Sequence, residues 1–173
     1  MKPVIRFAAG ILVAGAFSLA HAADHVSIVD YCDPTDPGWA PTGGCLLRDG
    51  DVTLAEFNAL LHSVLSPAVV GHPGWRMDPA FSEARAGKSL VVTNEGGRTH
   101  TLTEVANFGG GKVPPLSEGL TPAPGCAASV NTAPGERIVL KGLTEGDHLY
   151  QCCIHPWMRI TITPKDQHHE QVH

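Results

Sequence analysis

The most informative pattern in this chain of 173 residues is the stretch Tyr150-Gln151-Cys152-Cys153-Ile154-His155-Pro156-Trp157-Met158-Arg159. It places a thiol, an imidazole and a thioether at regular intervals, at Cys152, His155 and Met158. Sulfur and imidazole donors of this kind suit soft or borderline transition metals. Because Cys152 ends a predicted strand, the loop that follows could supply three ligands to one ion.

A fourth donor, His100, lies well upstream on a separate predicted strand. One thiolate, two imidazoles and a weak axial thioether make up the donor set of a mononuclear blue-copper (type 1) site. The predicted ligands of one copper ion are therefore His100, Cys152, His155 and Met158. Multicopper oxidases need His-x-His pairs, and the sequence contains none, so we expect an electron carrier and not an enzyme.

The loop at 150–159 resembles the copper loop of small bacterial cupredoxins, and is most similar to the short amicyanin type, in which Cys-x-x-His-Pro-x-Met-Arg recurs. Asn94, six residues before His100, also resembles the amicyanin arrangement. The resemblance covers about residues 75–164. It implies an all-β cupredoxin fold, a Greek-key β-sandwich with copper near one end. It also implies that Asn94 ties the two ligand loops together by hydrogen bonds.

The periodicity of the chain agrees with an all-β domain over 75–164. Short apolar or alternating runs, separated by Gly- and Pro-containing turns, predict a sandwich or barrel. The predicted strands are residues 90–93, 99–105, 137–140, 148–152 and 160–163.

The N-terminus has the pattern of a secretory signal peptide over residues 1–22. Lys2 and Arg6 precede an apolar run that ends at Ala20-His21-Ala22, an A-x-A cleavage pattern. The run is shorter than the roughly 20 residues of a membrane span, although an uncleaved anchor is the alternative. Cleavage after Ala22 predicts a periplasmic protein, and it changes the formal charge from −5 to −7.

Residues 23–74 are predicted to form an N-terminal extension with a loop and one helix. Pro, Gly and Asp dominate residues 23–52, which is typical of turns. Thr53 and Glu56 form a capping-box pattern, and the apolar residues after them predict a helix of about three turns ending at Pro67. The stretch 49–57 also resembles half of a calcium-binding loop, but the first two ligand positions carry no carboxylate.

Secretion favours disulfide formation, and the five cysteines are an odd number. Neighbouring strand residues point to opposite faces, so only one of Cys152 and Cys153 can face a metal. Cys152 has the spacing to His155, which leaves Cys153 free to pair. We expect Cys32–Cys45 and Cys126–Cys153, although four cysteines allow three connectivities.

The predicted function is one-electron transfer between redox partners, such as a c-type cytochrome docking near Pro156 and Trp157. A negative charge without basic runs excludes nucleic acid as a main partner, and we expect a soluble monomer with no membrane span after cleavage. The alternative is a role in copper tolerance, since the chain is also similar to copper-induced cupredoxins of the CopI type. The polar tail 165–173, with His168, His169 and His173, favours that role.

Overall fold

The computed structural model describes residues 25–62 and 74–166. The predicted signal peptide and its cleavage site, the residues around Pro67, and the three histidines of the tail lie outside the described residues. In the described part of the chain, no helix is long and apolar enough to cross a membrane.

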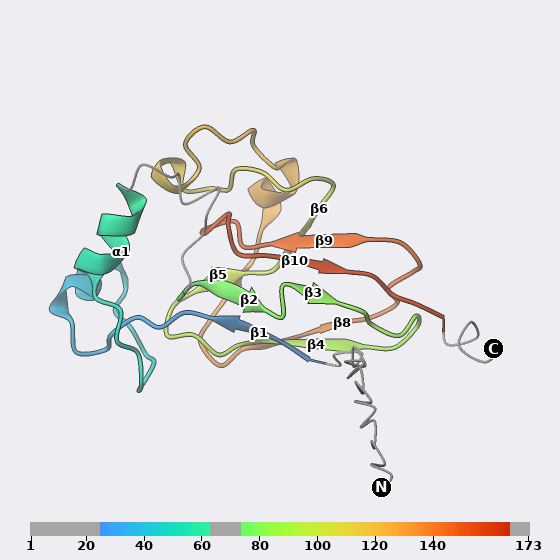
Figure 1. Cartoon of the computed structure of the whole chain (residues 1–173), viewed down its shortest axis with the longest axis horizontal. Helices are drawn as coiled ribbons and strands as arrows, with labels where there is room; N and C mark the ends of the chain where they lie inside the picture. Colours follow the sequence, from blue (N-terminus) through green and yellow to red (C-terminus); the bar gives the residue numbers. More distant parts are fainter. Residues whose placement is uncertain (1–24, 63–73, 167–173) are drawn as a thin grey trace, which may run out of the picture.

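Two mixed four-stranded sheets form a β-sandwich, as predicted (Figure 1). The first sheet has the order β2 (Arg76–Asp78), β1 (His25–Val29), β4 (Leu90–Asn94) and β8 (Arg137–Leu140). The second has the order β3 (Phe81–Ser82), β10 (Arg159–Ile162), β9 (His148–Gln151) and β6 (Thr103–Val105). A further pair joins β5 (His100–Thr101) to β7 (Asn131–Thr132). Most neighbouring strands are distant in sequence, as Greek-key connections require.

Each of the five predicted strands is present, with one change. The predicted strand 99–105 is divided into β5 and β6, because its two halves pair with different partners. His100 lies opposite Thr132 of β7, whereas Thr103 lies opposite Gln151 of β9. The division turns β5 out of the second sheet and places His100 beside the loop that follows β9.

The segment predicted as a loop at 23–52 contains a strand that sequence analysis missed. β1 is an inner strand, parallel to β4 on one side and antiparallel to β2 on the other. Val26 and Ile28 are fully buried on either side of the less buried Ser27, which is the alternation of a half-buried strand, and Val29 is buried as well. The many turn residues after position 30 hid this short pattern. Part of the predicted extension therefore belongs to the sandwich.

The predicted helix is present as α1 (Leu54–Leu61). Its capping box is confirmed, because the Thr53 amide donates to the Glu56 carboxylate at 2.9 Å and the Glu56 amide donates to Thr53 Oγ1 at 3.2 Å. The carboxylate of Asp36 accepts a further bond from the Leu54 amide at 2.7 Å. The described helix is shorter than the three turns expected. Three 3-10 helices complete the described elements, η1 (Pro37–Thr42), η2 (Pro114–Leu116) and η3 (Pro124–Ala128).

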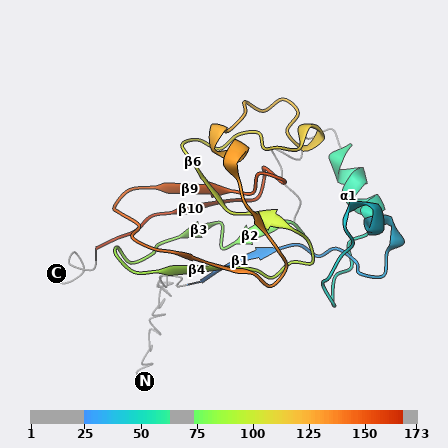
Figure 2. The same ribbon diagram turned by 180° about the vertical axis from the view of Figure 1, so that it is seen from behind.

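Aromatic packing joins α1 and η1 to the sandwich. Phe57 of α1 lies 5.0 Å from Trp75 and 5.5 Å from Trp39, measured between ring centroids. The three rings belong to the same buried core as the sheet residues Ile28 and Ile160. Seen from both sides, α1 and η1 cover the end of the sandwich where the β9–β10 loop lies (Figures 1 and 2).

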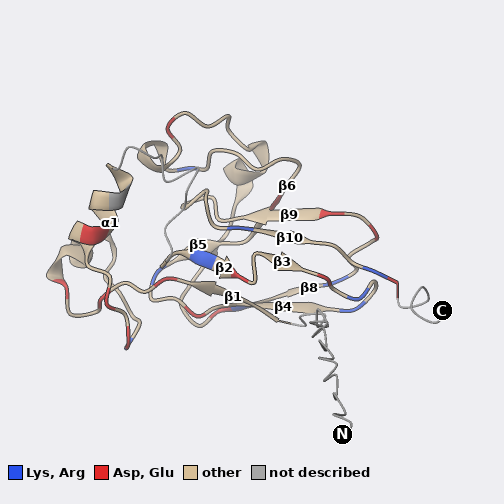
Figure 3. Cartoon of the chain, in the orientation of Figure 1, with Lys and Arg blue, Asp and Glu red and all other residues tan. Residues whose placement is uncertain are grey.

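Several acidic residues lie along the segment that forms this end of the molecule, as the ribbon coloured by residue type shows (Figure 3). Between residues 33 and 56 the chain carries five acidic side chains and, as its only Lys or Arg, Arg48. The acidic residues are Asp33, Asp36, Asp49, Asp51 and Glu56. The segment 33–56 therefore carries an excess of negative charge.

Candidate metal centre

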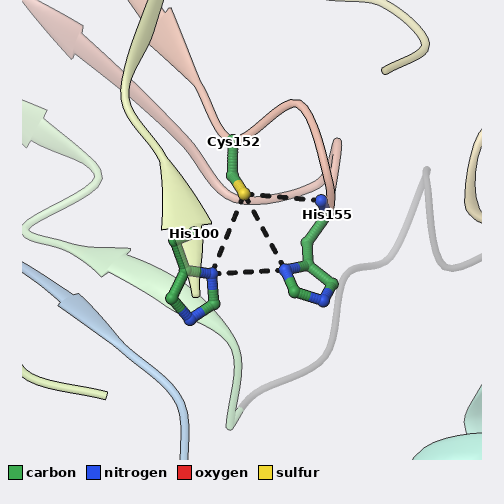
Figure 4. Close-up of side chains that lie close together, drawn as sticks. All are labelled: His100, Cys152 and His155. Carbon is green, nitrogen blue, oxygen red and sulfur yellow. Dashed lines mark hydrogen bonds between the residues drawn. The ribbon is translucent and has the colours of Figure 1, made fainter. Parts of the chain in front are cut away.

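Three of the four predicted ligands meet in one buried cluster (Figure 4). His100 comes from β5, Cys152 directly follows β9, and His155 lies on the turn toward β10. The Cys152 sulfur is 3.8 Å from Nδ1 of each histidine, and the two Nδ1 atoms are 3.2 Å apart. His100 and Cys152 are fully buried, and His155 is 6% exposed.

The donor atoms have the separations that one metal ion requires. Bonds of about 2.0 Å to nitrogen and about 2.3 Å to sulfur, meeting at about 100–120°, span such distances. Two imidazoles and a thiolate in a dry pocket suit copper among the first-row metals. The residues present therefore fit a copper ion.

Hydrogen bonds within the chain close the loop that carries Cys152 and His155. The Cys152 amide donates to the Met158 carbonyl at 2.9 Å, and the Met158 amide donates to the His155 carbonyl at 2.9 Å. Met158 is fully buried at the end of this loop. Its role as a weak axial ligand stays a prediction.

The Cys152 sulfur is stabilised as a thiolate. The amides of Thr101 and His155 donate to it at 3.4 Å and 3.5 Å. Burial alone would raise the pKa of Cys152, but the imidazoles of His100 and His155 hold that pKa well below its ordinary value. A metal ion would therefore meet a sulfur atom that has already lost its proton.

Asp30, which sequence analysis missed, supports His100 from the side away from the sulfur. Its carboxylate lies 2.7 Å from His100 Nε2, and both side chains are fully buried. Burial opposes their charges, but the contact lowers the pKa of Asp30, and together with Cys152 it raises the pKa of His100 to about 9. The sequence signal was weak, since Asp30 is recognisable only as the residue that follows the alternating run of β1.

Asn94 is fully buried and organises the turn before His100. Its side-chain amide donates to the carbonyls of Arg98 at 2.8 Å and Thr132 at 2.9 Å. These bonds join that turn to β7, whereas the resemblance implied a tie between the two ligand loops. Thr101 provides such a tie, because its hydroxyl accepts from the Cys153 amide at 2.7 Å and its own amide donates to Cys152.

The predicted disulfide pairing is confirmed. Disulfides join Cys32 to Cys45 and Cys126 to Cys153, and Cys152 is the free cysteine. Two consecutive cysteines therefore have different roles. Cys152 faces the histidines as a free thiol, and Cys153 links the loop to η3 through its disulfide.

A redox partner is expected to dock near Pro156 and Trp157, which follow His155, but neither residue is exposed. Pro156 is buried and Trp157 is half-buried. The rings of Phe57 and Trp157 lie 6.3 Å and 5.5 Å from the His155 ring, so α1 covers this edge of the site. Burial lowers the pKa of His155.

The side of His155 that faces away from Phe57 and Trp157 is open to a surface hollow. His155 lines a hollow of about 310 Å³ together with Leu46, Arg98 and Ile154. The Leu46 side chain is 75% exposed at this hollow. The η1 segment forms one wall, held by Arg98, which donates to the Thr42 carbonyl at 2.6 Å.

No protein-family model matches the chain, and no curated protein matches it. Among solved structures, it is similar to a purple cupredoxin from Nitrosopumilus maritimus, with 22% identity, 57% of this chain and 90% of the other covered, and a TM-score of 0.40. A reduced amicyanin variant has 19% identity, 50% and 70% coverage and a TM-score of 0.35. A copper-containing nitrite reductase from Thermus scotoductus has 18% identity, 81% and 28% coverage and a TM-score of 0.36.

Proposed function

We propose that this protein is a periplasmic one-electron carrier with a single type 1 copper ion. The observation that carries the proposal is the buried cluster in which His100 Nδ1, His155 Nδ1 and Cys152 Sγ lie 3.2 to 3.8 Å apart. A bound copper ion would supply the one-electron couple. His100, Cys152 and His155 would hold it, with Met158 as the weak fourth donor.

The chain would keep these donor atoms in the same positions in the oxidised and in the reduced state of the copper site. Two backbone amides hold the Cys152 sulfur, the Asp30 carboxylate holds the His100 ring, and the loop hydrogen bonds fix His155. The pocket is also buried, so bulk water does not reorganise around the donors. Both features reduce the structural change that accompanies electron transfer.

The absence of catalysis is part of the same proposal. A catalytic metal needs a coordination position that is open to substrate. With Met158 as the fourth donor of a buried site, the predicted ligand set leaves no such position. A nitrite-reduction assay of the copper-loaded protein, with a reduced dye as donor, should therefore show no turnover.

The proposed partner is a basic redox protein such as a c-type cytochrome. The acidic side chains between residues 33 and 56 lie at the end of the molecule that carries the site, and they would attract a positive partner (Figure 3). Since Pro156 is buried, we place the contact at the hollow beside His155, with Leu46 and Ile154 as its apolar residues.

The test is copper binding by matched cysteine variants. The purified chain loaded with Cu(II) should show the intense visible band of thiolate-to-copper charge transfer, and Cys152→Ser should lose it. The double variant Cys126→Ser/Cys153→Ser removes the neighbouring disulfide and should keep the band. Loss of the band in the double variant alone would refute the assignment of Cys152 as the ligand.

A role in copper tolerance is the second candidate from the sequence, and it rests on the histidine tail outside the described residues. The two roles predict different phenotypes. A deletion strain should fail under copper stress if the protein protects against copper. It should instead lose respiratory growth without added copper if the protein carries electrons.

A further inference from the structure

We propose that Asp30 is a positioning residue that fixes which nitrogen of His100 faces the Cys152 sulfur and lowers the reduction potential of the bound copper. The inference rests on the proposed function and goes beyond the predicted ligand set. It assigns a role to a residue of the N-terminal segment, which the sequence resemblance to cupredoxins does not cover.

The contact between Asp30 and His100 is short and dry. Asp30 Oδ2 lies 2.7 Å from His100 Nε2, and both side chains are 0% exposed. A carboxylate accepts hydrogen bonds and does not donate them when it is ionised, so Nε2 must carry the hydrogen. In the neutral ring, which is the form that binds a metal, the lone pair of His100 is then on Nδ1, the nitrogen that lies 3.8 Å from the Cys152 sulfur.

The Asp30 carboxylate is itself held in place by the backbone. The amides of Gly97 and Arg98 donate to it at 2.9 Å and 3.0 Å. These donors belong to the turn that leads into His100, whereas Asp30 directly follows β1. A single buried side chain therefore fixes both the ring of His100 and the turn before it. Carboxylates that hold a metal-binding histidine in this way commonly change metal affinity 10- to 100-fold when removed.

The charge of Asp30 acts on the potential as well as on geometry. A negative charge in a buried, weakly polarisable environment stabilises Cu(II) more than Cu(I), because the interaction grows with the charge of the ion. Arg98 is the cation that interacts electrostatically with Asp30, but its guanidinium donates to the carbonyls of Thr42 and Gly44. The hydrogen bonds of Arg98 are thus directed to the η1 segment, and they leave the carboxylate oxygens to the backbone amides and His100.

The decisive variant is Asp30→Asn, which keeps the shape of the side chain and one acceptor oxygen but removes the charge. We expect the ratio of Cu(II) to Cu(I) affinity to fall about tenfold, which is a rise of about 59 mV for a one-electron couple. Voltammetry gives the potential, and competition with chelators for each oxidation state gives the two affinities independently. The control is Asp33→Asn, three residues along the chain at a half-buried position, where both quantities should stay unchanged.

The outcomes separate the inference from the proposed function. If the unsubstituted protein shows no charge-transfer band, the proposed function fails. If the band is present but Asp30→Asn leaves the potential and affinity ratio unchanged, Asp30 is only structural and the inference is wrong. Should Asp30→Asn fail to fold, the same measurements on Asp30→Ser apply. If neither Asp30→Asn nor Asp30→Ser folds without copper, Asp30 is needed for folding, and the inference that it tunes the site is wrong.

Discussion

His100 and His155 face the same sulfur atom, but opposite kinds of neighbours hold them. The His100 ring is held by a buried carboxylate, which together with Cys152 raises its pKa to about 9. The His155 ring lies against Phe57 and Trp157, and burial lowers its pKa. One side of the site is therefore a polar anchor, and the other is an aromatic cap.

The difference shows what the N-terminal segment does. Asp30 of the polar anchor and Phe57 of the aromatic cap both come from residues that the sequence placed in an extension outside the copper-binding domain. In the structure this segment supplies a strand, a carboxylate and a covering helix to the site. Removing it should therefore damage both sides of the site, and single changes should separate them.

Breaking the aromatic cap should have the largest effect on stability. Phe57 is 7% exposed and packs against Trp39 and Trp75, so Phe57→Ala should lower the free energy of unfolding by about 3–5 kcal/mol. It should also expose the edge of His155 and speed electron exchange with a small soluble oxidant. Urea unfolding and stopped-flow mixing would measure the two effects.

The control for the cap is Leu46→Ala, because Leu46 is 75% exposed and lines the same hollow as His155. Its unfolding free energy should change by no more than about 0.5 kcal/mol. If Phe57→Ala unfolds at the same urea concentration as Leu46→Ala, α1 does not share the core of the sandwich.

The disulfide on the anchor side should have the next largest effect. Cys32 and Cys45 are 13 residues apart, and opening such a loop with Cys32→Ala/Cys45→Ala should reduce stability by about 3 kcal/mol. Because Cys32 lies two residues after Asp30, copper affinity should fall as well. Chemical unfolding and chelator competition would test both. If the variant loses stability but keeps its full copper affinity, the disulfide is not needed to hold Asp30 against His100.

Met158 belongs to neither side, and its replacement should change the potential without removing the metal. A thioether is a long, weak axial ligand, so Met158→Leu should retain copper and colour. The less coordinated copper favours the lower charge of Cu(I), and the potential should rise by about 59 mV for each tenfold change in relative affinity. Met158→Gln should lower it. Voltammetry on both variants decides, and loss of copper from the leucine variant would contradict an axial role.

The smallest effect is expected from an ion pair remote from both sides. His148 Nδ1 lies 2.8 Å from Glu104, whose hydrogen bond raises the pKa of His148 above its ordinary 6.5. Its stabilisation is complete below the unfolded pKa and is lost as the pH rises through the folded pKa. Glu104 is 54% exposed, so the pair should contribute a few tenths of a kcal/mol.

Glu104→Gln tests this pair. The variant should lower the His148 pKa in an NMR titration, and it should destabilise the protein at pH 5.5 but not at pH 9. Equal destabilisation at both values would mean that the charge of His148 contributes nothing.

The local pattern of the sequence determined much of this protein. The spacing of Cys152 and His155 on one short loop, with His100 on another strand, identified the three residues that meet in the buried cluster. The alternation of side chains along a strand separated Cys152 from Cys153 and left Cys153 free to pair. It did not choose among the three connectivities, and the structure joins Cys153 to Cys126. The capping box at Thr53 and Glu56 fixed the start of α1. Each of these depends on contacts within a few residues, or on donor types that only a metal site requires.

The tertiary structure alone decided what surrounds the predicted ligands. Asp30 reaches His100, 70 residues away, only because β1 pairs with β4 inside the first sheet. Phe57 covers His155 only because α1 shares its core with the sandwich. Neither contact leaves a periodic signal, since each depends on how strands from distant parts of the chain pair. A carboxylate at the end of a strand and a phenylalanine on a helix are ordinary in sequence, and the fold gives them their roles.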